Sequence, residues 1–224
     1  MGRLAVQSVT EAPDMVYAGS FARMSNPGEN VFDDIGELIR QRAPDVIVDF
    51  TLRPATQRVA RAAVEARIPV VIGSSEWNEP EREELCRLCE EHATPALIVP
   101  NFAIGAVLMM RFAQEAARFF PTAEIVELHR EDKRDKPSGT AAATARRIEA
   151  HGGPAEVPVH SVRLRGLLAH QEVLFGNAGE LLTIRHDSFS RESFAAGILF
   201  AIRNVRKLSG MHAGLDAVLD GAAS

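Results

Sequence analysis

The chain has 224 residues, of which 46% are hydrophobic and 25% are charged, and its formal net charge is -5. A chain of this length can bury a substantial core in one large domain or in two small ones. The negative charge gives no general attraction for nucleic acid, and no apolar run approaches the length of a membrane span. We therefore expect a soluble globular protein that has neither nucleic acid nor a membrane as a partner.

Cysteine usage and the start of the chain bear on the compartment. Cys86 and Cys89 form one C-x-x-C, and without a second pair they cannot make a four-thiolate zinc site within one chain. They are expected to be ordinary residues of a helix face, and no metal site is expected. No long apolar core or small-residue cleavage site follows residues 1–3, so no secretory signal is expected. Together these features predict a cytoplasmic protein.

The first half of the chain alternates between helical and strand patterns. Helices are predicted at residues 1–12, 31–42, 54–66 and 79–92. Strands are predicted at residues 15–21, 45–51, 70–72 and 96–99, with a loop over 22–29. The strand at 45–51 is a continuous apolar run that ends in polar groups, which is typical of a parallel strand buried on both faces. The alternation predicts a doubly wound parallel sheet with its ligand edge at the carboxyl ends of the strands.

After Ile104 the pattern changes to that of a second domain. Helices are predicted at residues 107–120, 140–150 and 194–207. Strands are predicted at residues 124–129, 157–165, 171–175 and 180–186, with a turn at 176–179 between the last two. The sequence therefore predicts an α/β protein in which a Rossmann-like nucleotide domain is followed by a mixed α+β domain.

The densest chemistry lies in residues 127–140, which read E-L-H-R-E-D-K-R-D-K-P-S-G-T. Lys133 follows His129 closely, and a lysine in a desolvated pocket can give up a proton, whereas an arginine stays charged. Ser138 or Thr140 can cap the helix that follows Pro137, so the free N–H groups of its first turn predict a site for a carboxylate or phosphate. A lone S-G-T is more simply a capped helix behind a solvated charge run. The upstream histidine and lysine favour the anion site.

The pattern E-L-H-x-x-x-K-x-D-x-P-S-G-T-A, with Asn101-Phe102 before it and Ser188-Phe189-Ser190-Arg191 after it, resembles the 4-hydroxy-tetrahydrodipicolinate (dihydrodipicolinate) reductases of lysine and diaminopimelate synthesis. The resemblance implies an oxidoreductase that passes a hydride from NADH or NADPH to 4-hydroxy-tetrahydrodipicolinate or its dehydrated form, giving tetrahydrodipicolinate. It implies a dinucleotide-binding domain over residues 1–103, completed by 195–224, and a substrate-binding and oligomerisation domain over 104–194.

The same resemblance implies roles for residues of the 127–140 stretch. His129 and Lys133 match the catalytic positions. Hydride addition to a conjugated imine leaves an enamine-like carbon that must be protonated, and cationic groups stabilise the developing negative charge. Gly139 and Thr140 match contacts to a substrate carboxylate, next to the predicted anion site at Ser138.

The implied cofactor contacts lie mostly where predicted strands end. Gly73-Ser74-Ser75 resembles the G-T-T of the family, and Val99-Pro100-Asn101-Phe102 resembles its A-P-N-F. In the family both loops contact the nicotinamide side of the cofactor. An acidic residue that usually binds the ribose hydroxyls of NADH is replaced by the cation of Arg23, which favours NADPH. The predicted cofactor contacts are Gly2, Arg23, Phe50, Thr51, Gly73, Ser74, Ser75, Val99, Pro100, Asn101 and Phe102.

The start of the chain departs from the family pattern. A dinucleotide-binding domain usually opens with a strand and a glycine-rich turn, here of the type G-x-x-G-R-M-G, and Met1-Gly2-Arg3 resembles only the end of that turn. We expect this domain to lack a central strand and to have unpaired strand edges. We also expect the chain as written to bind NAD(P)H more weakly than a version extended upstream.

Two alternatives to the leading function stay open on the sequence alone. One is a catalytically impaired relative or fragment that keeps the oligomerising domain, which a cofactor titration would identify. The other is a reductase of another small dicarboxylate imine, because Arg130 stands where the family usually has a second histidine that holds a substrate carboxylate. An arginine can also bind a carboxylate, and bidentately, so Arg130 stays a substrate-binding candidate. The resemblance further implies a homotetramer joined through the sheets of the second domain.

Overall fold

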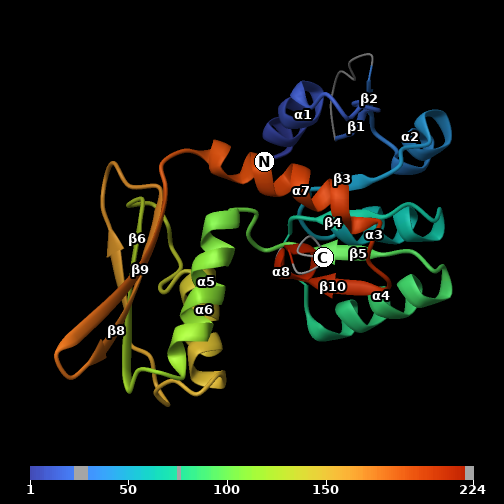
Figure 1. Ribbon diagram of the computed structural model, residues 1–224. Helices are drawn as coiled ribbons and strands as arrows, with labels where there is room; N and C mark the ends of the chain where they lie inside the picture. The colour runs from blue at the N-terminus through green and yellow to red at the C-terminus, as the bar shows by residue number, and fades with distance from the viewer. Residues whose placement is uncertain (23–29, 75–76, 220–224) are drawn as a thin grey trace. The chain divides into compact units, whose positions relative to one another are not determined.

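The computed structural model describes residues 1–22, 30–74 and 77–219, and the chain divides into two compact units (Figure 1). Unit 1 comprises Met1–Phe102 and Phe194–Ser224, and unit 2 comprises Ala103–Ser193. Most of the predicted loop over 22–29 lies outside the described residues, as do two of the predicted cofactor contacts, Arg23 and Ser75.

Every strand pair among the described residues of unit 1 is parallel. Its helices are α1 (Gly2–Glu11), α2 (Ile35–Arg42), α3 (Ala55–Glu65), α4 (Glu79–Glu91), α7 (Ala195–Val205) and α8 (Asp216–Leu219). Its strands are β1 (Ser20–Phe21), β2 (Val31–Phe32), β3 (Ile47–Asp49), β4 (Val70–Ile72), β5 (Ala96–Ile98) and β10 (Met211–Ala213). One sheet has the order β10-β5-β4-β3, and β1 and β2 form a separate two-stranded sheet. Among the described residues β3 pairs with β4 alone, so the parallel sheet is in two pieces.

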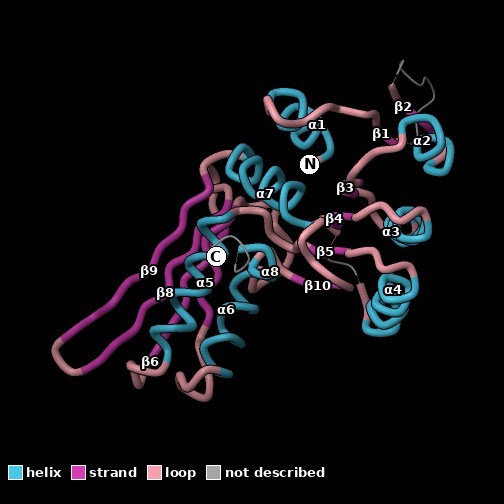
Figure 2. The backbone as a smooth tube through the Cα atoms, turned by 45° about the vertical axis from the view of Figure 1, so that its right-hand side comes forward, coloured by secondary structure: helices cyan, strands magenta, loops and turns pink. Residues whose placement is uncertain are grey.

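Helices cover both faces of the four-stranded sheet (Figures 1 and 2). On one face, Val70 and Ile72 of β4 pack in the same core as residues of α3 and α4. On the opposite face, α7 packs against β4 and β5. All residues of these two strands are fully buried, which explains their continuous apolar sequences and confirms the predicted Rossmann-like sheet.

The expected helix over 31–42 is wrong at its start. Asp34 caps α2, since its carboxylate accepts a hydrogen bond from the backbone N–H of Glu37 at 2.7 Å, so the helix begins at Ile35. The preceding residues Val31 and Phe32, a β-branched and an aromatic residue, pair in parallel with Ser20 and Phe21 instead.

Two further differences concern strands. Of the strand expected over 15–21, only the two residues of β1 find a pairing partner. The three residues of β10 pair in parallel with β5, although no strand is predicted there from the sequence. Its pairing joins segments far apart in the chain, which no local pattern reveals. No helix within the described ranges is long and apolar enough to cross a bilayer.

Unit 2 is a mixed sheet with helices on one face (Figure 1). Its helices are α5 (Ile104–Ala117), α6 (Gly139–Ala150) and the 3-10 helix η1, which begins at Arg191 and ends at Phe194. Its strands, in the order β7-β6-β8-β9, are β7 (Val159–Arg163), β6 (Thr122–His129), β8 (Ala169–Asn177) and β9 (Glu180–Ser188). Only β6 and β7 pair in parallel, so the predicted mixed α+β domain is confirmed.

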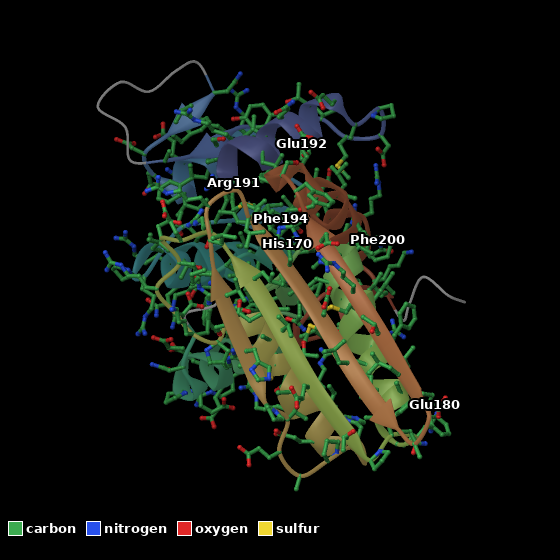
Figure 3. The ribbon with its side chains drawn as sticks, turned by 90° about the vertical axis from the view of Figure 1, so that its left-hand side faces the viewer. His170, Glu180, Arg191, Glu192, Phe194 and Phe200 are labelled. Atoms are coloured by element: carbon green, nitrogen blue, oxygen red, sulfur yellow. The ribbon has the colours of Figure 1, made fainter. Side chains whose placement is uncertain are left out.

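The two faces of this sheet differ. Ala123, Ile125 and Glu127 of β6 are buried toward α5 and α6, because alternate residues of a strand share a face. The opposite face is turned toward the viewer in Figure 3, where His170 lies near one end of β8 and Glu180 at the hairpin end of β9. The helix-covered face therefore carries the core. On this face of β6, the only ionisable side chains are those of Glu127 and of His129, the last residue of the strand.

Candidate active site

The candidate site gathers where β6 ends and α6 begins, within unit 2. Glu127 and His129 lie two residues apart and so reach the same face of the sheet. The loop over 130–137 then returns the chain to Ser138, the N-cap residue of α6, whose hydroxyl accepts from the N–H of Ala141 at 3.2 Å. Gly139 and Thr140 are the first two helical residues. Backbone N–H groups point outward along the axis at the start of a helix, so this turn is a candidate anion site.

Glu127 is the centre of the hydrogen-bond network at this site, although its side chain is completely buried. Arg163 donates to it twice, from Nη1 to Oε2 at 3.0 Å and from Nη2 to Oε1 at 2.7 Å. The backbone N–H of Ser138 donates to Oε1 at 3.3 Å. Burial alone would raise the pKa of Glu127, but Arg163, the Ser161 hydroxyl and His129 together hold this pKa below its ordinary value. Glu127 is therefore ionised.

His129 lies against this carboxylate, with Nδ1 2.5 Å from Glu127 Oε2. Burial lowers the pKa of His129 below its ordinary value, Glu127 opposes that effect, and the charges of Lys133 and Arg163 add to it. A neutral imidazole beside an ionised carboxylate must carry its proton on Nδ1, because a carboxylate only accepts. Nε2 is then the unprotonated nitrogen and can accept a proton.

The predicted cations of the loop have partners in the same loop. The Lys133 ammonium donates to both carboxylate oxygens of Asp135 at 2.8 Å, and this contact lowers the pKa of Asp135. Arg130 forms an ion pair with Asp132, with Nε 2.7 Å from Oδ1. The structure thus brings His129 and the α6 N-terminus together on one carboxylate and holds Lys133 and Arg130 through neighbouring aspartates.

Neither Glu127 nor Arg163 is predicted as a functional residue from the sequence. A signal for the first is present, since Glu127 stands at an inward position of a strand between Val126 and Leu128, and a buried carboxylate needs a partner. The partner itself depends on the pairing of β6 with β7, in which His129 lies opposite Arg163. That register is not readable from the sequence.

The predicted cofactor contacts of unit 1 lie mainly where parallel strands end. Phe50 and Thr51 follow β3, Gly73 and Ser74 follow β4, and Val99, Pro100, Asn101 and Phe102 follow β5. Because β3, β4 and β5 run parallel, these loops leave the same edge of the sheet. Gly2 instead begins α1, which packs on α7, and is exposed.

Polar atoms at this edge suit a nicotinamide cofactor. Within the described residues, Asp49 Oδ2, Thr51 Oγ1 and Ser74 Oγ are buried and have no hydrogen-bond partner. The other Asp49 oxygen accepts from the N–H of Thr51 at 3.0 Å. Leaving such an atom unsatisfied costs about 1–3 kcal/mol, so each needs a partner from solvent or a ligand. The hydroxyl and amide groups of a nicotinamide and its ribose have the matching chemistry.

Gly73 is required by the packing of two aromatic rings at this edge. The rings of Phe50 and Phe102 lie 5.4 Å apart between centroids, and a Cβ on Gly73 would lie 2.4 Å from two ring atoms of Phe50 and 3.1 Å from Phe102. Only glycine therefore allows the end of β4 to approach this pair.

Replacing Gly73 with alanine is expected to displace the Phe50 ring and to weaken cofactor binding severalfold. Overpacking of this kind costs about 1–3 kcal/mol of stability. Calorimetric titration with NADPH and thermal unfolding would measure both effects. Gly139→Ala is the matched control for these two quantities, because its Cβ would meet no atom within 4 Å. NADPH affinity equal to that of the parent would contradict the placement of the cofactor at this edge.

The two cysteines lie on α4 and are free thiols. Burial raises the pKa of Cys89 to about 12, so this thiol is unreactive at neutral pH. Within the part of the chain that the structure describes, no group of three or more His, Cys, Asp or Glu side chains is placed to hold a metal ion.

Comparison with known proteins gives consistent matches along the chain. The family model "Dihydrodipicolinate reductase, N-terminus" matches residues 1–102, and "Dihydrodipicolinate reductase, C-terminus" matches residues 105–219. The 4-hydroxy-tetrahydrodipicolinate reductase of Moorella thermoacetica is 44% identical over 92% of this chain and 84% of its own length. That of Enterococcus faecalis is 41% identical over 98% of this chain and 95% of its own length.

Solved structures agree with these matches. The dipicolinate-bound dihydrodipicolinate reductase from Paenisporosarcina sp. TG-14 superposes with a TM-score of 0.88 at 33% identity, covering 96% of this chain and 94% of that one. A probable dehydrogenase from Thermotoga maritima superposes with a TM-score of 0.69 at 12% identity, a likeness of fold alone.

Proposed function

This chain belongs to the dihydrodipicolinate reductase family, and we propose that it transfers a hydride from NAD(P)H to 4-hydroxy-tetrahydrodipicolinate, or its dehydrated form. The product is tetrahydrodipicolinate, an intermediate of lysine and diaminopimelate synthesis. One observation in the site carries the proposal: His129 and the N-cap residue Ser138 contact the same buried carboxylate, at 2.5 and 3.3 Å from Glu127. The imidazole of His129 therefore lies beside the N-terminus of α6. A dianionic substrate needs such a helix N-terminus to bind a carboxylate, and its reduction needs a nearby group that can supply a proton.

The residues of unit 2 supply the charge and the proton. The N–H groups at the start of α6, with Gly139 and Thr140, bind one substrate carboxylate. Arg130 is the candidate for the other, through the guanidinium that now contacts Asp132. An arriving dianion favours the charged form of His129, so substrate binding raises the pKa of a ring that is neutral without substrate. His129 and Lys133 then protonate the enamine-like carbon and stabilise its charge.

The cofactor is a nicotinamide dinucleotide that binds at the carboxyl edge of the β3-β4-β5 sheet. The buried unpartnered atoms of Asp49, Thr51 and Ser74 support this placement. We infer a preference for NADPH from the cation of Arg23, an argument from the sequence alone. Titration of the chain with NADPH and NADH in parallel tests it, and tighter binding of NADH would contradict it.

The decisive assay follows the loss of reduced nicotinamide when the purified chain meets freshly generated substrate. Consumption with at least one cofactor is the expected result. A folded chain that binds cofactor yet consumes none would fit the impaired relative, whereas faster turnover of another small dicarboxylate imine would assign the alternative substrate that Arg130 suggests.

We also propose that the chain assembles as a homotetramer through the open face of the unit 2 sheet. That face carries Val126, Leu128, Leu174 and Leu181, the last with 68% of its surface exposed. Exposed apolar groups on an open sheet face favour burial against another copy. Sedimentation should give the mass of four chains, and a monomer would contradict the proposal.

Replacing Gly139 with alanine is expected to raise the KM for substrate without lowering the melting temperature. The added Cβ meets no atom of the chain within 4 Å, so it would occupy the space in front of the helix where the carboxylate is proposed to bind. Alanine is also the better helix former, by about 1 kcal/mol. Steady-state kinetics would measure the KM, and thermal unfolding would measure the melting temperature. An unchanged KM would place the carboxylate elsewhere.

A further inference from the structure

Arg163 and Glu127 form a buried ion pair behind the proposed catalytic residues. The Arg163 side chain is 6% exposed and that of Glu127 is 0% exposed. Arg163 ends β7, opposite His129 in the strand register, so its side chain can reach across to Glu127. The two contacts of 3.0 and 2.7 Å match the planar fork of a guanidinium to the two carboxylate oxygens.

Two further contacts of Arg163 hold the loop that carries Lys133. Its Nε donates to the carbonyl of Lys133 at 3.2 Å, and Nη2 donates to the carbonyl of Asp135 at 2.7 Å. The side chains of Lys133 and Asp135 also contact each other, with Nζ 2.8 Å from Oδ1. One guanidinium therefore fixes the backbone on both sides of Arg134, and with it the point from which the lysine side chain projects.

Two further contacts of Glu127 reach the end of β6 and the start of α6. One oxygen lies 2.5 Å from His129 Nδ1 at the end of β6, and the other accepts from the backbone N–H of Ser138 at the start of α6. The pair thus joins the strand end, the loop and the helix N-terminus. An apolar pair of similar volume is often at least as stable as a buried ion pair, so stability alone does not account for these charges.

We propose that Glu127 and Arg163 are positioning residues of the active site. Glu127 fixes the ring orientation and the Nδ1–H tautomer of His129, and Arg163 fixes the backbone that carries Lys133. The proposal rests on the proposed roles of His129 and Lys133 in the reductase reaction. It gives the ion pair a role in catalysis without direct contact with the reacting atoms.

The first test is the titration of His129, followed by NMR on ring-labelled protein without substrate. The charged groups around the ring are Glu127, Lys133 and Arg163. Glu127→Gln keeps an acceptor for Nδ1 but removes the negative charge that favours the imidazolium. The titration midpoint of His129 should therefore move down by about one pH unit or more. The ring of the parent protein should show the Nδ1–H tautomer, and an Nε2–H tautomer would contradict the proposal.

The second test compares Arg163→Lys with Arg165→Lys. Arg165 donates from Nε to both oxygens of Glu131 at 2.9 and 2.8 Å, in the same loop, but its side chain is 85% exposed. Both changes keep the charge and remove the fork. Arg163→Lys should lower kcat about tenfold or more, because a misplaced catalytic group loses its orientation. Arg165→Lys should leave kcat unchanged, and NADPH affinity should be the same in both variants.

A third variant separates positioning from stability. Glu127→Leu/Arg163→Met replaces the pair with apolar side chains, and such a pair should fold with a melting temperature near that of the parent. Its kcat should nevertheless fall at least as far as in Arg163→Lys. A folded double variant with parental kcat would overturn the proposal. So would an unmoved His129 titration together with equal kinetics in the two lysine variants.

These outcomes are distinct from a failure of the proposed function. If the parent protein does not reduce the substrate, the reductase assignment fails, while the tautomer and titration of His129 still test its dependence on Glu127. If the parent is active, the ring titration does not respond to Glu127→Gln, and Arg163→Lys and Arg165→Lys have equal kcat, the positioning role fails and the reductase assignment stands.

Discussion

Replacing Lys133 with alanine is expected to lower kcat by about two orders of magnitude or more. The proposed role of Lys133 is to protonate the reduced substrate and to stabilise its developing charge, and general acid catalysis contributes about 10²–10⁴ in rate. The melting temperature should change little. Lys133 pairs with Asp135, whose side chain is 56% exposed, and exposed ion pairs contribute about 0–1 kcal/mol.

Lys136→Ala is the matched control, since it removes the other lysine of the same loop. Its kcat should equal that of the parent. Lys133→Arg separates the two parts of the role, because arginine keeps the charge and cannot give up a proton. Partial activity in this variant would assign the charge to Lys133 and the proton to His129. Near-normal turnover of Lys133→Ala would refute the catalytic assignment.

Replacing Thr140 with valine is expected to raise the KM for substrate by about tenfold to a hundredfold. Thr140 is the second residue of α6, and a hydrogen bond to a charged group is worth about 1.5–3 kcal/mol. Valine keeps the shape of threonine. It also keeps the backbone carbonyl that accepts from the Thr144 hydroxyl at 2.8 Å, so the helix should remain intact.

Cofactor affinity is the internal control for Thr140→Val. If the KM for substrate stays at the parental value and only NADPH affinity falls, the helix N-terminus binds a cofactor phosphate and the assignment to the substrate carboxylate is wrong. Far-UV circular dichroism and thermal unfolding would show whether the change acts through folding instead.

The sequence by itself determines the elements whose signals are local. The continuous apolar runs of β4 and β5 predict strands buried on both faces, and the structure confirms this. Asn78 and Glu81 form a capping box at the start of α4, and Ser138 caps α6. Caps and periodicity involve residues within a few positions of one another, so they can be recognised without knowledge of the fold. The motif over 127–140 is local in the same way, and it identifies the family.

The tertiary structure alone decides which distant segments meet. The pairing of β10 with β5, the pairing of β1 with β2, and the position of Arg163 opposite His129 all depend on strand register. A one-residue change of register would turn Arg163 to the other face of the sheet and leave Glu127 buried without a counter-ion. Strand pairing joins residues far apart in sequence, and its free energy depends on how the whole core packs. The residues that carry the proposed chemistry are therefore evident in the sequence, whereas the ion pair that holds them becomes visible only in the folded protein.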